Sequence, residues 1–563
     1  MADHQNTILP VEVSRDGAPD THHTRSPTTI SYVPSETATL NGGAGSGFTT
    51  GKGAPLDGLP EAGPLSSITQ PSGEHRIPDF VPRKHDHRTL VLCFDGTGDQ
   101  FDTDNSNIVE MFSILKKDDP DKQMVYYQAG IGTYTVPQIA TPLMAKVSKT
   151  FDEMIAWNLD AHIMGGYEFL MQNYRAGDKI CIFGFSRGAY TAHCLAGMIH
   201  KVGLLPACNH QQVAFAYKMY TRTDTLGWKQ SNAFKAAFSC HVDIDFLGVW
   251  DTVNSVGLFP RRLPFTTSNT CVRVFRHAIA LDERRAKFKY NTWHGADPQQ
   301  LALAESGKVS ATNNEKDANA QHGHRRFSWK KNRKRKTQKM FESEFSDLHE
   351  LSSDVEQVWF AGCHCDVGGG SVTNGMRPNL ARIPLRWMIR ETFKCRTGIL
   401  FSTQGLRSIG LDLDQDWCPA PKCPPLKNPE GLKIDSPKPL AKLTDKEHEI
   451  LVEEMAAKER LMSEEEIDLR DALSPIYDQL SIAPFWWVME LFPIKQKVQK
   501  SNKTWISHFK INLGRGRHIQ GQKKRGVKVH RSVQIRMNAT HTSNGKPYKP
   551  KANLNLDRVT WVD

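Results

Sequence analysis

The sequence predicts an α/β fold, in which a mainly parallel β-sheet is flanked by helices and carries a disordered N-terminal tail and insertions. Three observations predict this class. Short apolar runs alternate with longer segments whose apolar residues recur at helical spacing. Each apolar run ends in small or polar residues, as buried parallel strands do at their carboxyl edge. One run passes through a tight glycine turn directly into a helical segment.

The elements follow one another in a regular alternation. Strands are predicted where an apolar run is bounded by turn residues, and helices where apolar residues return every three or four positions. Asn105 or Ser106 is the expected N-cap of the first helix. In chain order the predicted elements are strand 90–94, helix 105–117, strand 122–132, helices 151–174, strand 180–183 with a helix after it, strand 246–250 and strand 358–362.

Composition divides the 563 residues into four parts. The first is a tail rich in Gly, Pro, Ser and Thr, which is typical of disorder. The α/β pattern follows, interrupted by a polar insertion at about 296–345. We expect a disordered tail over 1–85, a catalytic domain over 86–400, a linker with a charged helix over 401–480, and a basic extension over 481–563 that packs on or next to the catalytic domain.

The net charge of +11 is concentrated in two places. Residues 494–563 contain 17 Lys and Arg but only 2 Asp and Glu, and the run from Arg325 to Lys339 contains 9 Lys and Arg and no acid. The rest of the chain is therefore acidic. This distribution predicts contacts made by the C-terminal part and by the insertion, rather than a basic surface over the whole molecule.

The sequence also indicates where the protein is found. It contains no apolar run long enough to span a bilayer and no N-terminal signal-peptide pattern. Its eleven cysteines are scattered, which fits free thiols in a reducing compartment. We therefore expect an intracellular, cytoplasmic protein. The basic run 325–339 is interpreted as a solvated disordered loop, with a nuclear localisation signal or a contact with lipid headgroups as the alternatives.

The segment Gly184-Phe185-Ser186-Arg187-Gly188 carries the strongest local signal for chemistry. It is a G-x-S-x-G pattern between an apolar run and a helical segment. This strand–turn–helix context is that of a nucleophile elbow, where small residues flank the serine because the turn is tight. We therefore predict Ser186 as a nucleophile. The alternative is an ordinary glycine-rich turn with an unreactive serine.

A serine nucleophile needs a base and an acid that orients the base. Asp251 and His364 each follow an apolar strand, and the order Ser186, Asp251, His364 is that of hydrolases with a nucleophile elbow. We predict these three residues as the catalytic set. The alternatives are Asp243 or Asp245 as the acid and His277 as the base, whereas His193 is expected to pack or to lie at the surface.

Acyl transfer also requires donors for the oxyanion of the tetrahedral intermediate. The backbone amide of Arg187, directly after the serine, is one expected donor. The glycine-rich turn after the first strand is the expected source of the other, through the amides of Gly96 and Thr97. The alternative is that this segment is only a turn.

We expect neither a metal nor another cofactor. Cys363 and Cys365 flank His364, but neighbouring side chains on a strand point to opposite faces and do not close easily on one ion. Cys418 and Cys423, which lie among prolines, are the remaining candidates for a zinc clip.

Several segments together resemble one family. The segments FDGTGDQ, GFSRGAY, GVWDTV, RHAIALDERR and FAGCHCDVGGG occur in this order between about 88 and 400. They are similar to the type VI secretion phospholipase effector catalytic-domain family, formerly a domain of unknown function, which has many fungal members. The resemblance implies an α/β-hydrolase fold, cleavage of phospholipid acyl esters, and a triad of Ser186, Asp251 and His364.

The predicted function is therefore that of a serine hydrolase that cleaves carboxylic esters through an acyl-enzyme, with lipid or phospholipid esters as the implied substrates. The competing hypothesis is a catalytically silent hydrolase fold that serves as a scaffold or lipid-binding module. Peripheral membrane contact is expected through the basic C-terminal part, and nucleic acid is not an expected partner. The aromatic segment from Phe485 to Phe492 is interpreted as a helix packed on the core, with a lipid interface as the alternative.

Overall fold

The structure is a computed structural model that describes residues 78–97, 99–130, 144–253, 263–293, 353–413, 431–436, 444–484, 486–491, 493–499 and 505–563. Nearly all of the predicted tail 1–85 lies outside these ranges. So do the polar insertion 296–345, the basic run within it, and Cys418 and Cys423.

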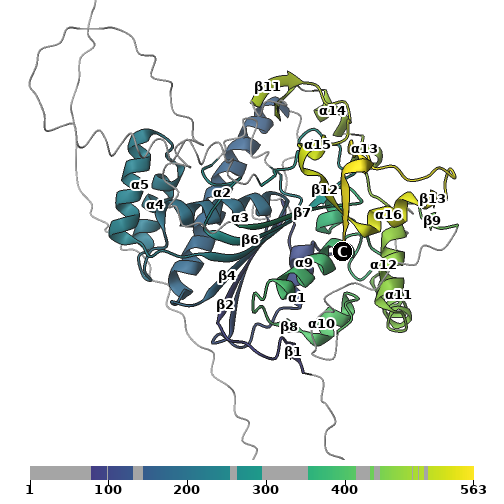
Figure 1. Cartoon of the computed structure of the whole chain (residues 1–563), viewed down its shortest axis with the longest axis horizontal. Helices are drawn as coiled ribbons and strands as arrows, with labels where there is room; N and C mark the ends of the chain where they lie inside the picture. Colours follow the sequence, from purple (N-terminus) through teal and green to yellow (C-terminus); the bar gives the residue numbers. More distant parts are fainter. Residues whose placement is uncertain are drawn as a thin grey trace, which may run out of the picture. The chain divides into compact units, whose positions relative to one another are not determined.

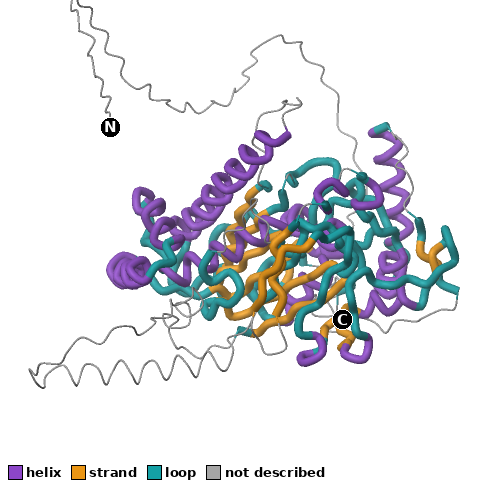
Figure 2. Tube along the Cα trace, turned by 90° about the horizontal axis from the view of Figure 1, so that it is seen from above, coloured by secondary structure: helices purple, strands orange, loops and turns teal. Residues whose placement is uncertain are grey.

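A parallel β-sheet of eight strands forms the centre of the molecule, in the order β14-β12-β7-β6-β5-β4-β2-β3 (Figures 1 and 2). The predicted strands are all present in it. They are β2 Thr89–Phe94, β3 Gln123–Gln128, β4 Lys179–Phe185, β5 Ile244–Trp250 and β7 Asp354–Phe360. Three further strands complete the sheet, namely β6 Val272–Ala280, β12 Val527–His530 and β14 Val559–Val562.

Helices cover both faces of this sheet, as a parallel sheet with apolar strands requires. Within β2, Leu90 and Leu92 pack with one group of helices, whereas Val91 and Cys93 point to the opposite face and pack with another. The first group is α2 Met144–Asn173, α3 Ser186–Val202, α4 His210–Thr221 and α5 Thr225–Phe238. The second includes α1 Asn107–Ser113, α9 Arg382–Lys394 and α10 Thr403–Ser408. The predicted α/β fold class is confirmed.

The N-cap of α1 is Ser106, one of the two residues predicted for this position. Ser106 Oγ accepts hydrogen bonds from the backbone N–H groups of Ile108 and Val109, which would otherwise lack partners at the start of the helix. The same hydroxyl donates to Asp95 Oδ1 at 2.6 Å. The cap therefore also anchors the turn that follows β2.

The charged helices after residue 400 pack on the core through buried ion pairs. Helix α9 carries arginines on one face, and Arg386 pairs with Asp468 at 2.6 Å and with Asp471 at 2.8 Å. Both acids lie on α12 (Glu464–Leu473), which follows α11 (Asp445–Glu459). The acidic composition of this region is thus matched to arginines of the sheet-covering helix.

The C-terminal part extends the sheet. β12 pairs with β7 and also with β14, so the last strands of the chain are members of the central sheet. The remaining elements are β1 Phe80–Val81, β8 Phe401–Ser402, α8 His364–Gly368, β9 Lys433–Ile434, α13 Gln479–Ile482, α14 Trp486–Glu490, β10 Ile494–Gln499, β11 Trp505–Lys510, α15 Gln522–Arg525, α16 Arg531–Met537, β13 Thr540–His541 and the 3-10 turn Leu556–Arg558. Within the described ranges, no helix combines the length and the apolar character needed to cross a bilayer.

Candidate active site

The turn between β4 and α3 has the geometry of a nucleophile elbow. Ser186 has a φ of 56°, which lies in the left-handed region and is unusual for a residue other than glycine. A Cβ atom on Gly184 would lie 2.6 Å from Ala189 Cα, and one on Gly188 would lie 2.2 Å from the Asp95 carbonyl oxygen. Neither position tolerates a side chain, so the two glycines are a steric requirement of the turn.

The structure brings the three predicted triad residues into one hydrogen-bonded chain. His364 Nδ1 lies 2.6 Å from Asp251 Oδ2, and His364 Nε2 lies 2.8 Å from Ser186 Oγ. An ionised carboxylate can only accept, so Nδ1 carries the proton and Nε2 accepts from the serine hydroxyl. The side chains come from the ends of β5, β7 and β4, where parallel strands place ligand sites.

Asp251 is held as a carboxylate. Burial alone would raise the pKa of Asp251, but the charge of Arg517 and hydrogen bonds from His364 and Arg517 outweigh burial and hold this pKa below its usual value. The backbone N–H of Ala280 also donates to Asp251 Oδ1 at 3.0 Å. The acid is therefore ionised and fixed in orientation.

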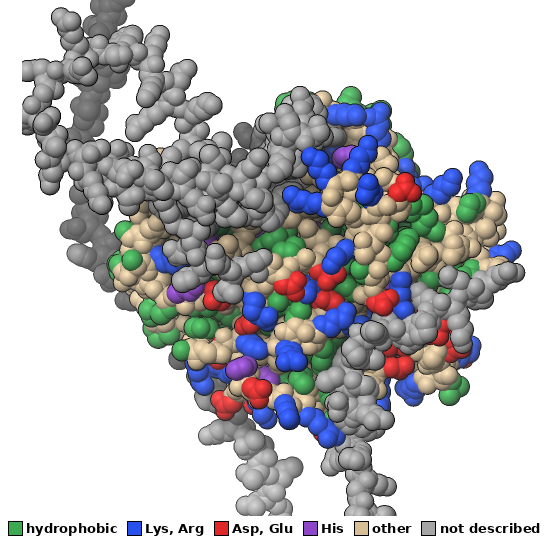
Figure 3. Space-filling model, viewed as in Figure 1, with side chains coloured by type: hydrophobic (Ala, Val, Ile, Leu, Met, Phe, Trp, Pro, Cys, Tyr) green, Lys and Arg blue, Asp and Glu red, His purple; other side chains and the backbone are tan. Residues whose placement is uncertain are grey.

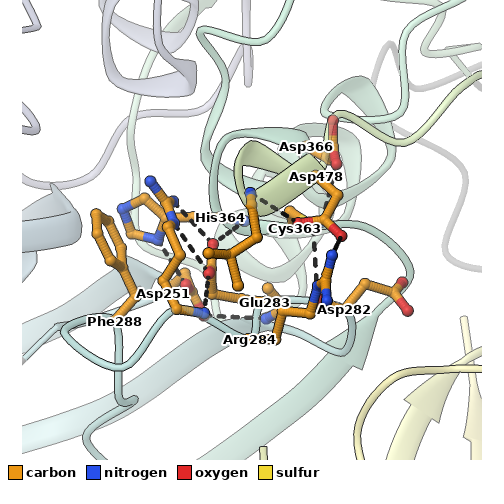
Figure 4. Close-up of polar contacts among 12 residues, drawn as sticks. Asp251, Asp282, Glu283, Arg284, Phe288, Cys363, His364, Asp366 and Asp478 are labelled. Carbon is orange, nitrogen blue, oxygen red and sulfur yellow. Dashed lines mark hydrogen bonds and ion pairs between the residues drawn. The ribbon is translucent and has the colours of Figure 1, made fainter. Parts of the chain in front are cut away.

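His364 is enclosed by aromatic rings. The ring of Phe185 stacks on it at 4.7 Å and that of Phe288 meets it edge-on at 4.8 Å; Figure 4 shows Phe288, Asp251 and Glu283 close to His364. Burial lowers the pKa of His364, and the hydrogen bond to Asp251 opposes this effect. The imidazole is thus neutral at neutral pH, the state in which it can accept a proton.

Three carboxylates hold the backbone loop that carries His364. The consecutive amides of Gly362, Cys363 and His364 donate to Asp282, Asp366 and Glu283, respectively, at 2.7, 2.8 and 3.2 Å. Burial raises the pKa of Asp366 to about 6, partly offset by its hydrogen bonds. The sequence alone did not indicate a role for these acids, although Asp282 and Glu283 lie in the segment RHAIALDERR.

The alternative acids and bases are occupied elsewhere. His277 lies in β6, and its Nε2 accepts the backbone N–H of Thr252 at 3.2 Å. The ring of His193 packs against the rings of Phe275 and Trp293. Asp245 Oδ1 accepts from Arg273 Nε at 3.0 Å, and Asp243 lies just before β5 rather than at its carboxyl end.

The turn after β2 lies against the elbow, because the backbone of Gly188 packs on the carbonyl groups of Phe94 and Asp95. The Gly96 N–H donates to Asp95 Oδ1 at 2.8 Å, so this amide is already engaged. Thr97 Oγ1 is buried and has no hydrogen-bond partner among the described residues. Of the three predicted oxyanion donors, the Gly96 amide is therefore already paired, and Arg187 and Thr97 stay candidates.

Arg517 is a further residue of the site that the sequence did not predict. Its guanidinium pairs with both oxygens of Asp251, with Nη2 2.9 Å from Oδ2. The only signal was local: Arg517 follows two closely spaced glycines, and a Cβ atom on Gly516 would lie 1.8 Å from the Lys551 carbonyl oxygen. That pattern indicates a tightly packed turn but not its partner.

Within the described residues, no three His, Cys, Asp or Glu side chains converge as a metal site would require. Cys363 and Cys365 are free thiols, and burial raises the pKa of both, which keeps them protonated. Cys418 and Cys423, the remaining candidates for a zinc clip, lie outside the described ranges.

With this geometry in place, comparison with known proteins decides the family. Residues 88–391 match the family described as T6SS, phospholipase effector Tle1-like, catalytic domain. The chain belongs to this family. The resemblance found in the sequence is thereby confirmed, and membership of a phospholipase effector family indicates hydrolysis of lipid esters.

Individual proteins that resemble this chain share between 15% and 28% sequence identity with it. The uncharacterized protein YEL023C of Saccharomyces cerevisiae is 28% identical over 560 residues, which cover 80% of this chain and 79% of that protein. Two solved structures share 15% identity: an uncharacterized protein from Pseudomonas aeruginosa (TM-score 0.28, 69% of this chain and 53% of that chain) and the Tle1 effector bound to the VgrG spike of the type 6 secretion system (TM-score 0.24, 54% and 56%). The chain thus spans little more than half the length of these two chains.

Proposed function

We propose that this Tle1-like protein is a serine hydrolase that cleaves lipid or phospholipid acyl esters through an acyl-enzyme. The observation that carries the proposal is the chain of hydrogen bonds from Ser186 through His364 to Asp251 at the nucleophile elbow. A fold kept only as a scaffold has no need of this chain.

In the proposed reaction His364 Nε2 takes the proton of Ser186 as Oγ attacks the ester carbonyl carbon. Asp251 keeps the imidazole oriented and stabilises the imidazolium. The proton then passes to the alcohol as it leaves, and a second cycle with water releases the fatty acid from the acyl-enzyme. The base is buried, so its low pKa keeps it neutral and ready for this role.

The oxyanion is assigned to the backbone amides of Arg187 and Thr97. Arg187 stands in the first turn of α3, where amides point away from the helix and the dipole favours negative charge. The buried Thr97 hydroxyl is a further donor in the same turn. Gly96 contributes by allowing its turn to lie against the elbow, since a Cβ there would lie 2.8 Å from the Phe185 ring.

We further propose that a membrane surface presents the lipid to the site through the C-terminal part. Trp487, Leu491 and Phe509 are 40%, 62% and 71% exposed, respectively, in a region of net positive charge. Figure 3 shows Lys and Arg side chains around β11 and α14. Exposed aromatic and aliphatic side chains among basic ones suit an anionic bilayer.

This surface is linked to the site by packing. The ring of Trp486 in α14 contacts Phe288 at 5.5 Å, and Phe288 contacts His364. In the aromatic segment, Trp486 packs toward the core and Trp487 is exposed. We infer that one side of this helix packs on the core while the other is free to contact lipid. A cytoplasmic location stays a prediction.

The test uses the full chain with a fluorophosphonate probe and a panel of soluble esters and phospholipid vesicles. We expect the wild type to be labelled and to release fatty acid, and Ser186→Ala to do neither. Ser408→Ala, an exposed serine on α10, is the matched control and should behave as the wild type. Hydrolysis that persists in Ser186→Ala would contradict the mechanism. A folded wild type that neither labels nor hydrolyses any ester would favour the scaffold hypothesis.

A further inference from the structure

Arg517 makes a two-pronged ion pair with the acid of the triad. Both terminal nitrogens of its guanidinium contact the Asp251 carboxylate, and the same nitrogens donate to the carbonyl oxygens of Ala280 and Phe288 at 3.0 and 2.6 Å. The side chain is buried, and the ring of Tyr290 lies 5.5 Å from it. Such a paired fork fixes orientation as well as charge.

This arginine comes from outside the region that defines the family. The match covers residues 88–391, and Arg517 lies 266 residues after Asp251. The same C-terminal segment reaches the base as well: Tyr548 donates its hydroxyl to Asp282 at 2.7 Å, and Asp282 in turn accepts the amide of Gly362 beside His364. Two independent contacts thus join the segment to both partners of the serine.

We propose that Arg517 is a positioning residue of the Ser186–His364–Asp251 chain, which makes the C-terminal segment part of the active site. The inference rests on the proposed serine hydrolase function. Arg517 acts through Asp251: it holds the carboxylate in the plane that His364 needs, and it supplies the positive charge that keeps this buried acid ionised.

The charge of the site shows why Arg517 matters. With a neutral imidazole, the Asp251–His364 pair carries one negative charge in a buried place, and Arg517 balances it. Without that cation the pair binds a proton more readily, whichever of the two groups takes it. Protonation removes the general base, so loss of Arg517 should move the acidic limb of the activity profile to higher pH.

Other ionisable groups around the pair do not replace this cation. Glu283 and Arg285 neutralise each other at 2.8 Å. Burial lowers the pKa of His277 to about 4, raises that of Tyr290 to about 12, and raises that of the Cys363 and Cys365 thiols, so these four groups are uncharged near neutral pH.

The experiment measures kcat, KM and the pH profile of full-length Arg517→Gln and Arg517→Lys on a soluble short-chain ester. The matched control is Arg515→Gln, an exposed arginine in the same turn. Arg517→Gln should lower kcat about ten- to a hundredfold with KM within about twofold, and should raise the acidic limb by about one pH unit. Arg517→Lys keeps the positive charge, so the acidic limb of its pH profile should lie at the wild-type pH. Its kcat should still be at least about threefold below that of the wild type, because lysine lacks the planar fork of the guanidinium.

Two results would overturn the inference. One is an Arg517→Gln variant with the kcat of the wild type and an acidic limb at the wild-type pH. The other is that Arg517→Gln and Arg517→Lys both lose activity and both show the same shift of the acidic limb. If Arg517→Gln does not fold, Arg517→Lys decides alone, and a wild-type kcat in that variant counts against us. Failure of the proposed function would show separately, as wild-type activity that survives Ser186→Ala. In that case the titration of His364 is followed by NMR, and its signal is identified by its loss in His364→Gln. This signal must still titrate at a higher pH in Arg517→Gln than in the wild type.

Discussion

Replacement of Asp251 by asparagine should damage activity and stability together. The substitution leaves the shape of the side chain but removes its charge. The buried guanidinium of Arg517 then has no counter-ion, and His364 Nδ1 loses its carboxylate acceptor. Ser186→Ala removes the nucleophile but leaves every buried charge paired, so the two inactive variants should differ sharply in stability.

The magnitude follows from the buried ion pair. Removing one partner of such a pair costs about 3–5 kcal/mol, because an uncompensated charge remains inside. The entropy of unfolding is about 2.1 cal/mol/K per residue, or about 1 kcal/mol/K for the unit His75–Asp563, so we expect Tm to fall by about 3–5 °C. The loss in kcat should be about ten-thousandfold, as for other triads without a correctly held base.

Thermal unfolding followed by circular dichroism, with ester hydrolysis measured on the same samples, tests this expectation. Ser186→Ala should keep Tm within about 1 °C of the wild type, since it gives up one hydrogen bond. The double variant Asp251→Asn with Arg517→Met should regain part of the lost stability while staying inactive, because the unpaired charge is gone. A Tm of Asp251→Asn equal to that of the wild type would refute the reasoning.

Three further predictions concern other parts of the molecule. His277 is buried and its folded-state pKa of about 4 lies below the unfolded value, so the unfolded chain binds more protons and stability is lost as pH falls from about 6.5. His277→Gln should reduce that loss by up to about 1.4 kcal/mol per pH unit in denaturant titrations; an unchanged slope would contradict the buried neutral state. Gly188→Ala should cost about 1–3 kcal/mol in the same assay and abolish probe labelling, because its Cβ would meet the Asp95 carbonyl at 2.2 Å; a stable, reactive variant would show that the turn can shift. Phe509→Ser should weaken sedimentation with anionic vesicles without changing hydrolysis of a soluble ester. The control Phe238→Ser, at another exposed phenylalanine on α5, should change neither, and equal effects of the two substitutions would argue against the C-terminal membrane surface.

Much of the central sheet was predictable because its strands are apolar throughout. Residues such as Leu90 to Phe94 are buried on both faces, and a parallel sheet covered by helices leaves that mark in the sequence. The elbow at Ser186 was predictable for a local reason, since its two glycines are required by contacts within the turn. The roles of β12 and β14 were not, because both strands are short and lie in a basic, polar segment.

The structure shows that the basic residues of the C-terminal segment do not all lie at the surface. Composition marks residues 494–563 as basic, which by itself suggests a surface for an acidic partner. Three of the described basic residues are instead buried: Arg517 on the acid of the triad, Arg531 beside Asp468, and Arg536 on the carbonyl oxygens of Ala472 and Ser474. A sequence reports how many charges a segment has, but not which of them turn inward.

By itself the sequence determined the fold class, the nucleophile turn and the order of the three residues that the structure brings together. These features depend on local patterns: apolar runs, glycine spacing and strand ends. Only the tertiary structure decided what holds the triad, namely the carboxylates beneath His364 and the arginine on Asp251. Those contacts join segments up to 266 residues apart in the chain. No local sequence pattern indicates which two distant charged residues will be buried together.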